Sequence, residues 1–135
     1  MMAPFPAMRV LTRRLLALEA ASESKMDPPQ PEALRVLEKL RVSVTRFAGL
    51  EGFNALQRRA LALARAEAPV LEAMTIGPDG HLAEPEKLFT GADDTGAEAI
   101  MAITTQLLAL LIAFIGEPLT LRLVREVWPD ATPGE

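Results

Sequence analysis

TGAEAIMAITTQLLALLIAFI, residues 95–115, is the most apolar stretch of this 135-residue chain. Thr95 and Glu98 hold the two polar positions of a capping box, in which side chains bond the free N–H groups at a helix start. No charged residue follows between Ala99 and Ile115. A helix that is apolar on every side belongs in the centre of a bundle. We therefore predict a central helix over residues 95–115, around which the other elements pack.

A membrane span is the alternative interpretation of residues 99–115. A transmembrane helix needs about 20 apolar residues, and this run is shorter and contains Thr104, Thr105 and Gln106. It also lacks the flanking cluster of Lys and Arg that orients a span. We expect a buried core helix and no membrane partner, with the span over 99–115 as the minority possibility.

Apolar residues recur at helical spacing in four further segments. These predicted helices cover residues 6–22, 32–48, 51–68 and 118–128. The turn between the second and third lies at Gly49–Gly52. The positions expected to face the core in the first three are Met8, Leu11, Leu15 and Leu18, then Ala33, Val36, Leu37, Leu40, Val44, Phe47 and Ala48, then Phe53, Leu56, Ala60 and Leu63.

One further turn lies before the central helix. Pro78-Asp79-Gly80 suits a tight turn, because Pro presets φ, Asp bonds its own backbone and Gly accepts a positive φ. Its short apolar flanks predict a two-stranded β-hairpin that leans on the helices.

These elements predict one domain over residues 1–135. Its fold class is all-α, a bundle of four to five helices with one small β-hairpin inserted before the central apolar helix. A Pro-rich linker over residues 24–31 separates the first two helices. Residues 1–5 and 129–135 are expected to fray.

Composition excludes several function classes. The chain has no cysteine, so disulfides, thiolate catalysis and Cys-ligated metals are excluded. Its net charge of −4 argues against general nucleic-acid binding. Arg9, Arg13 and Arg14 interrupt the N-terminal apolar residues, unlike a signal peptide. We expect a cytoplasmic protein, and its Arg-, Ala- and Leu-rich composition suggests a bacterial source.

No motif predicts catalysis or a cofactor. His81, the single histidine, stands beside Asp79, which allows a metal site or an acid–base pair. A transition-metal site normally has more than one His or Cys. Ser43 lies in no nucleophile-elbow motif, and Gly49–Gly52 lacks the Lys of a phosphate loop. We therefore predict no catalytic, cofactor-binding or metal-ligating residues, and more readily a non-enzymatic protein than an enzyme.

The last predicted helix, residues 118–128, is the candidate partner surface. Its apolar residues cover an arc of about 200°, more than one neighbouring helix needs. Trp and Arg are enriched at binding hot spots. Burial on two sides within one domain is the alternative. The predicted partner-binding residues are Leu119, Leu123, Val127 and Trp128.

Together these features favour a helical protein-interaction or regulatory module that self-associates, as a homodimer or other homo-oligomer. The first alternative is a small-molecule-binding or enzymatic helical domain that uses carboxylates and Arg in a pocket between helices. Buried charges clustered around a cavity would favour it, whereas a solid aliphatic core would favour the interaction module. The second alternative is a nucleic-acid-binding regulator, with Arg58, Arg59 and Arg65 as its basic face.

Overall fold

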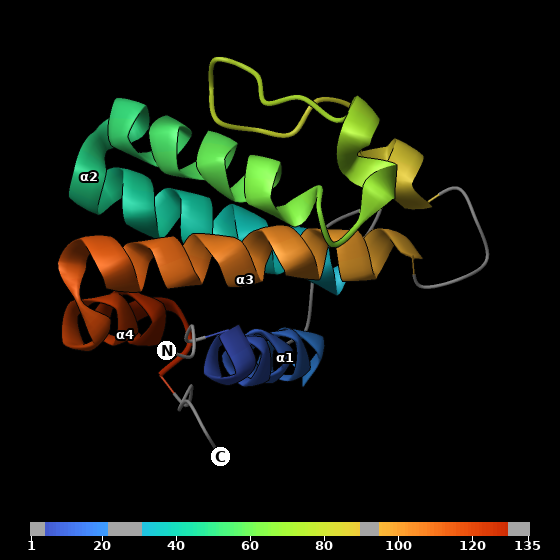
Figure 1. The fold of residues 1–135 in the computed structure, drawn as a ribbon. Coiled ribbons are helices and arrows are strands. Elements are labelled where there is room, and N and C mark those ends of the chain that lie inside the picture. Colours follow the sequence, from blue (N-terminus) through green and yellow to red (C-terminus); the bar gives the residue numbers. More distant parts are fainter. Residues whose placement is uncertain (1–4, 22–30, 90–94, 130–135) are drawn as a thin grey trace.

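The protein is a bundle of four α-helices in the computed structural model, which describes residues 5–21, 31–89 and 95–129. The prediction of an all-α bundle is confirmed for these residues (Figure 1). The predicted linker falls outside them except for Pro31, as do residues 1–4 and 130–135. The elements are α1 (Phe5–Ala21), α2 (Glu32–Ala64), the short 3-10 helices η1 (Pro69–Ala73) and η2 (Pro85–Phe89), α3 (Thr95–Ile115) and α4 (Glu117–Val127).

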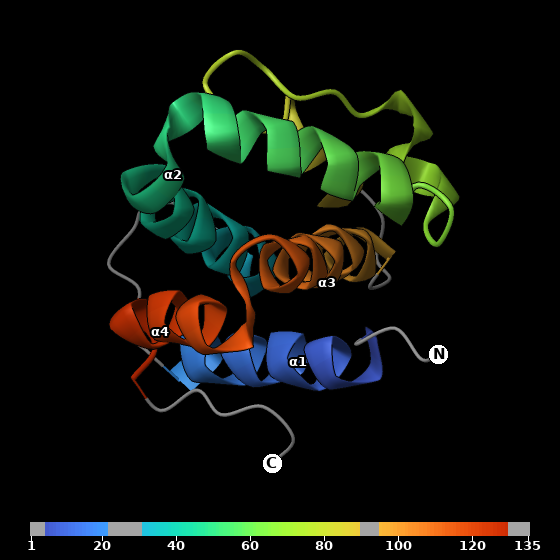
Figure 2. The same cartoon turned by 60° about the vertical axis from the view of Figure 1, so that its left-hand side comes forward.

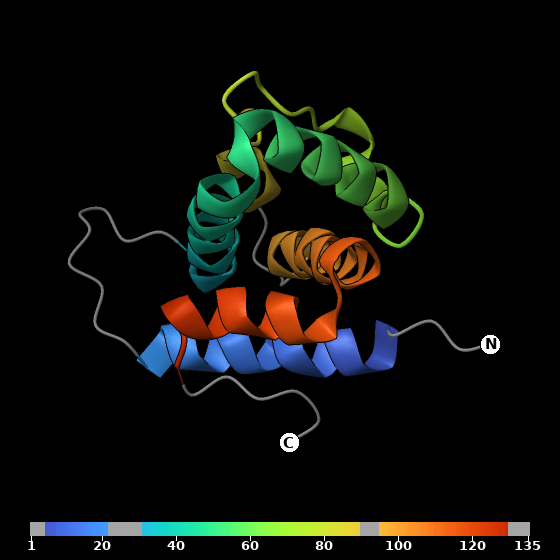
Figure 3. The ribbon, with the colours of Figure 1, turned by 90° about the vertical axis from the view of Figure 1, so that its left-hand side faces the viewer.

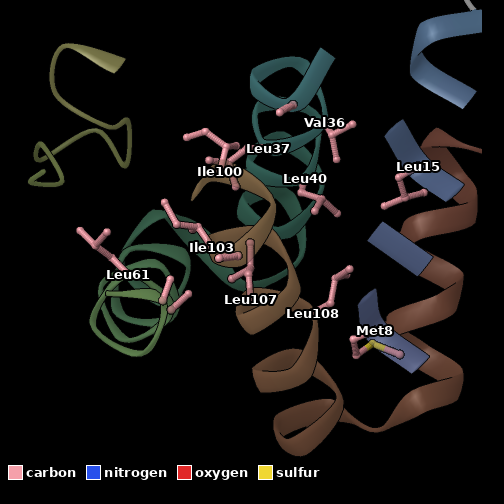
Figure 4. Packing of buried hydrophobic residues seen from close by; sticks show 14 of the residues in the cluster. Met8, Leu15, Val36, Leu37, Leu40, Leu61, Ile100, Ile103, Leu107 and Leu108 are labelled. Atoms are coloured by element: carbon pink, nitrogen blue, oxygen red, sulfur yellow. The ribbon is translucent and has the colours of Figure 1, made fainter. Parts of the chain in front are cut away.

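Helix α3 lies in the centre, as predicted from its apolar circumference. Helix α2 covers one side of it, and α1 and α4 cover the other (Figure 3). Ile100, Ile103, Leu107 and Leu108 are fully buried. Figure 4 shows them among buried side chains from α1 and from both halves of α2. Area burial of this kind supplies most of the favourable free energy of folding.

The three polar residues in the middle of α3, Thr104, Thr105 and Gln106, are also buried and hydrogen-bonded. Thr104 Oγ1 donates to the carbonyl of Ile100 at 3.0 Å, and Thr105 Oγ1 lies 2.9 Å from Thr12 Oγ1 of α1. Gln106 Nε2 donates to Glu67 Oε2 at 2.7 Å. By length and composition, α3 is still the one helix of the described residues that could cross a membrane. In this bundle 56% of its apolar window is buried, and core helices pass the same test.

Helix α2 bends sharply at Gly49, where the sequence predicts a turn. Gly49 has φ 84° and ψ 163°, a backbone conformation that residues with a Cβ rarely adopt. The two halves of α2, one on each side of this non-helical residue, correspond to the two predicted helices and diverge from Gly49 (Figure 2). The second half ends at Ala64, not at residue 68 as predicted. After Ala64, the backbone N–H groups of Glu67 and Ala68 both donate to the carbonyl oxygen of Ala64. The 3-10 helix η1 then begins at Pro69.

Two predicted core positions of α2 are wrong. Ala33, Val36, Leu37, Leu40 and Val44 are buried as expected, but Phe47 is 49% exposed and Ala48 is exposed. Both precede the bend, which lies at one end of the molecule (Figure 1). Helical periodicity identifies the face of a helix but not where its neighbour ends.

The predicted β-hairpin is also wrong. Residues 69–89 contain a single isolated bridge, between Ile76 and Leu82, and no strand. The turn itself forms, since Gly80 N–H donates to Gly77 O at 3.0 Å and Gly80 has φ +86°. The 3-10 helices that begin at Pro69 and Pro85 leave the flanking segments too short for a ladder.

Candidate functional site

A pocket of about 310 Å³ lies between the two halves of α2 and the loop that follows η1. Four apolar residues form much of its wall. Three residues of α2, Glu38, Arg41 and Gln57, and one of the loop, His81, supply polar groups. The apolar wall consists of Leu34, Leu37, Leu82 and Pro85.

The turn at residues 77–80 brings His81 to this pocket. Asp79 Oδ1 accepts the backbone N–H of His81 at 3.1 Å, and Asn54 Nδ2 of α2 donates to Pro78 O at 3.0 Å. A Cβ at Gly80 would lie 2.7 Å from Asn54 Oδ1 and 3.1 Å from the ring of Phe53. Glycine therefore allows the turn to lie directly on α2, and that contact fixes His81 over the pocket.

His81 lies between two carboxylates. Its Nε2 is 3.0 Å from Glu38 Oε1, and its Nδ1 is 2.9 Å from Asp79 Oδ2. Arg41 binds the same Glu38 carboxylate through Nε, at 3.0 Å, and Nη2, at 2.7 Å. Only a protonated ring can donate to both carboxylates at once. We call Glu38, Arg41, Asp79 and His81 the Glu38 cluster.

The pKa directions in the Glu38 cluster agree with this geometry. Burial alone would raise the pKa of Glu38, but the hydrogen bonds and charge of Arg41, with those of His81, outweigh it and lower the pKa. The hydrogen bond from His81 lowers the pKa of Asp79. The hydrogen bond to Glu38 raises the pKa of Arg41. Both carboxylates are therefore charged at neutral pH.

Gln57, which lines the pocket, has a buried side-chain oxygen without a donor. Its side chain is 1% exposed, and its Oε1 accepts no hydrogen bond from the described residues. Asn54 Oδ1, beneath the same loop, is buried and equally without a donor. A buried acceptor without a donor costs about 1–3 kcal/mol. Both oxygens are enclosed by the fold and are not open to the pocket.

The sequence identified only part of this site. It singled out His81 with Asp79, but neither Glu38 nor Arg41 was predicted as a site residue. The missed signal is the i, i+3 spacing of Glu38 and Arg41, which favours a side-chain pair on one helix face. In the described part of the chain, no group of three or more His, Cys, Asp or Glu is arranged to hold a metal ion.

The predicted partner-binding residues lie largely inside the chain. Leu123 is 6% exposed and Trp128 is 5% exposed, while Leu119 and Val127 are half-buried. Neighbouring helices of the same chain therefore cover much of the wide apolar surface of α4. This arrangement is burial on two sides within one domain, the alternative that the sequence left open for this helix.

Trp128 belongs to a second group of charges, the Glu19 cluster, formed by Glu19, Arg35, Lys39 and Trp128. Arg35 Nε and Lys39 Nζ each lie 2.8 Å from the Glu19 carboxylate, and Trp128 Nε1 donates to it at 3.2 Å. Burial alone would raise the pKa of Glu19, but the hydrogen bonds of Lys39, Arg35 and Trp128 outweigh it and lower the pKa. The cluster joins α1, α2 and the end of α4.

Exposed apolar side chains gather at the two chain reversals. Phe47 and Leu50, which flank Gly49, are 49% and 41% exposed, and Phe114, just before the α3–α4 corner, is 78% exposed. Both reversals lie at the same end of the molecule (Figure 1). We call these three residues the apolar end.

Comparison with known proteins gives no further guide to the site. No protein-family model, no curated protein and no solved structure matches this chain.

Proposed function

We propose that the protein binds a small molecule in the pocket between the two halves of α2 and the loop at residues 77–85. The observation that carries this proposal is the Glu38 cluster placed at the edge of a cavity with an apolar wall. Ligand sites typically combine a largely apolar wall with a few placed polar groups. The volume of about 310 Å³ lies at the small end of such sites.

A pocket between helical segments that is lined by a carboxylate and an Arg matches the first alternative drawn from the sequence, although that alternative expected buried charges and the Glu38 and His81 side chains are 41% and 46% exposed. The ligand is held here by surfaces that already exist in the fold, because the turn is fixed on α2 by Asn54 and Gly80. A preformed site loses less conformational entropy on binding. We propose binding without a chemical step.

Ligand-observed NMR with a library of small polar-headed compounds tests the proposal. Binders should shift the backbone amides of Gly80, His81 and Leu82. The variant Leu34→Trp should weaken every binder, because an indole would occupy part of the cavity. Val42→Trp, on the same half of α2 but outside this pocket, is the matched control. Compounds that bind the Leu34→Trp variant as tightly as the unmodified protein would contradict the proposal. A library in which no compound binds would also contradict it.

A second candidate function is self-association through the apolar end. Phe114 carries it, since a Phe that is 78% exposed, at the same end of the molecule as the exposed Phe47 and Leu50, is a surface that a partner could cover. This proposal keeps the homodimer expected from the sequence but moves its interface away from Leu123 and Trp128. Symmetric dimers are the commonest homo-oligomers.

Analytical ultracentrifugation at micromolar concentration tests the second candidate. A dimer should dissociate in Phe114→Ser and persist in Val70→Ser, which changes an exposed residue of η1. A monomeric unmodified chain would contradict self-association, and a dimer insensitive to Phe114→Ser would contradict this interface.

A further inference from the structure

We infer that the pocket takes a compact, uncharged molecule with a hydrocarbon body. This inference rests on the proposed function and adds the chemical class of the ligand. Three properties of the pocket carry it. The charges at its edge balance, its donor-less oxygens are closed to a ligand, and its open wall is largely apolar.

The charges at the edge of the pocket balance one another. Glu38 and Asp79 carry one negative charge each, and Arg41 carries one positive charge. The His81 ring lies 3.0 Å from Glu38 Oε1 and 2.9 Å from Asp79 Oδ2, and it is positively charged when it donates to both. The Glu38 cluster then has no net charge, and each charged group in it already has a partner of opposite charge.

A charged head group therefore gains little in this pocket. It must leave water, which costs free energy unless a group of opposite charge takes the place of the water. An ammonium group would compete with Arg41 and His81 for Glu38. A ligand carboxylate would compete with Glu38 for Arg41. An uncharged ligand avoids both costs, so the cluster selects against a charge of either sign.

The two donor-less oxygens near the pocket do not require a donor from the ligand. Gln57 Oε1 and Asn54 Oδ1 accept no hydrogen bond from the described residues, but both atoms are enclosed by the fold. A ligand in the pocket cannot reach them without moving the surrounding side chains. The part of the wall that a ligand contacts is therefore set by the other lining residues.

The wall and the size of the pocket favour a single hydrocarbon ring. Leu34, Leu37, Leu82 and Pro85 form the apolar wall, and a hydrocarbon that packs against them removes apolar surface from water. The pocket volume of about 310 Å³ is roughly twice that of an apolar cavity of about 150 Å³ that holds one benzene molecule. A single ring with one short, uncharged substituent fits this volume.

Three probes with the same ring and different head groups test the inference on the unmodified protein. Cyclohexylmethanol is uncharged, cyclohexylmethylamine is a cation and cyclohexanecarboxylate is an anion. Each is titrated at about pH 6, where a histidine ring is ordinarily charged, while the amides of Gly80, His81 and Leu82 are followed by NMR. We expect the alcohol to bind about tenfold more tightly than either ion.

The outcomes separate this inference from the proposed function. An amine or a carboxylate that binds as tightly as the alcohol would overturn the selection against charge and leave a small-molecule pocket. If none of the three probes shifts the three amides, the pocket does not take a compact ring and the inference fails. The library screen alone then decides the proposed function.

A matched pair of variants tests whether the balanced charges exclude the two ions. Glu38→Gln removes one negative charge, so the carboxylate should gain about tenfold in affinity relative to the alcohol. Arg41→Gln removes one positive charge, so the amine should gain by a similar factor. Glu51→Gln, an exposed change on the second half of α2, should alter neither preference.

The result that would overturn the role of the cluster is an unchanged order of affinities in both Glu38→Gln and Arg41→Gln. Circular dichroism verifies that the two variants are folded. If either is not, the head-group series on the unmodified chain decides the inference.

Discussion

The Glu19 cluster and the Glu38 cluster use the same chemistry in two different surroundings. In each, a carboxylate on a helix accepts hydrogen bonds from a basic side chain of α2 and from an aromatic or imidazole ring of a distant segment. The Glu19 side chain is 3% exposed, whereas the Glu38 side chain is 41% exposed. Burial is therefore the main difference between them.

That difference separates a structural role from a binding role. The partners of Glu19 come from α2 and the end of α4, so its carboxylate joins three elements and leaves little room for a ligand. The partners of Glu38 come from the same helix and from a surface loop, and the carboxylate faces a cavity. Removing the charge partners of a buried carboxylate lowers the stability of the fold far more than removing those of an exposed one.

The largest expected effect is the contrast between Glu19→Ala and Glu38→Ala. Glu19→Ala should reduce the free energy of unfolding by about 3 kcal/mol, because it leaves the buried guanidinium of Arg35 without this carboxylate. Glu38→Ala should cost less than about 1 kcal/mol, since water can solvate its partners. Urea denaturation followed by circular dichroism measures both. Equal losses would show that the two clusters have the same role.

A smaller loss is expected when Trp128 loses only its N–H. Trp128→Phe keeps an aromatic ring in the buried site but removes the donor to Glu19, for an expected cost of about 1.5 kcal/mol. Phe114→Leu, at the exposed apolar end, is the control and should change stability by less than about 0.5 kcal/mol. Thermal unfolding by circular dichroism compares them. A negligible loss for Trp128→Phe would show that Trp128 acts through packing alone.

Acid should weaken the Glu19 cluster. The pKa of Glu19 is lower in the folded protein than its ordinary value of 4.5, so the folded state binds this proton less readily than the unfolded state. The stabilisation is therefore complete above about pH 4.5 and is lost as the pH falls through the lower, folded pKa. Glu19→Gln should be less stable at pH 7 and lose less on acidification. Denaturation between pH 3 and pH 7 measures this, and parallel curves would contradict it.

The sequence predicted the fold better than the site. The main elements of the fold depend on residues close together in the sequence, whereas the site depends on contacts between residues far apart in it. The apolar run of α3, the bend at Gly49 and the turn at Gly80 are set by neighbouring residues, and all three lie where predicted. The predicted strands on either side of that turn do not form. Short 3-10 helices begin at Pro69 and Pro85 and leave too few residues for strands between them.

The charged clusters depend on contacts that periodicity does not encode. Trp128 and Glu19 are 109 positions apart, and the helical pattern of residues 118–128 showed only that this end was apolar over a wide arc. Glu38 and Lys39 both lie outside the predicted core positions of residues 32–48, yet Glu38 lines the pocket and Lys39 binds a buried carboxylate. Only the packing of helices against each other distinguishes these outcomes.

The smallest expected effect on stability is that of His81→Asn, and it gives the sharpest separation between the two clusters. The His81 side chain is 46% exposed, and exposed ion pairs contribute about 0–1 kcal/mol, so the free energy of unfolding should change by less than about 0.5 kcal/mol. The same change removes one of the two groups that occupy Glu38 Oε1, and it leaves Arg41 in place. Binding of the small molecules found in the library screen should therefore persist, because Arg41 and the apolar wall of the pocket are unchanged. Isothermal titration with such a binder and urea denaturation measure the two quantities on one sample. A loss of stability comparable to that of Trp128→Phe would show that His81 holds the loop on α2, and the Glu38 cluster would then be a structural element like the Glu19 cluster.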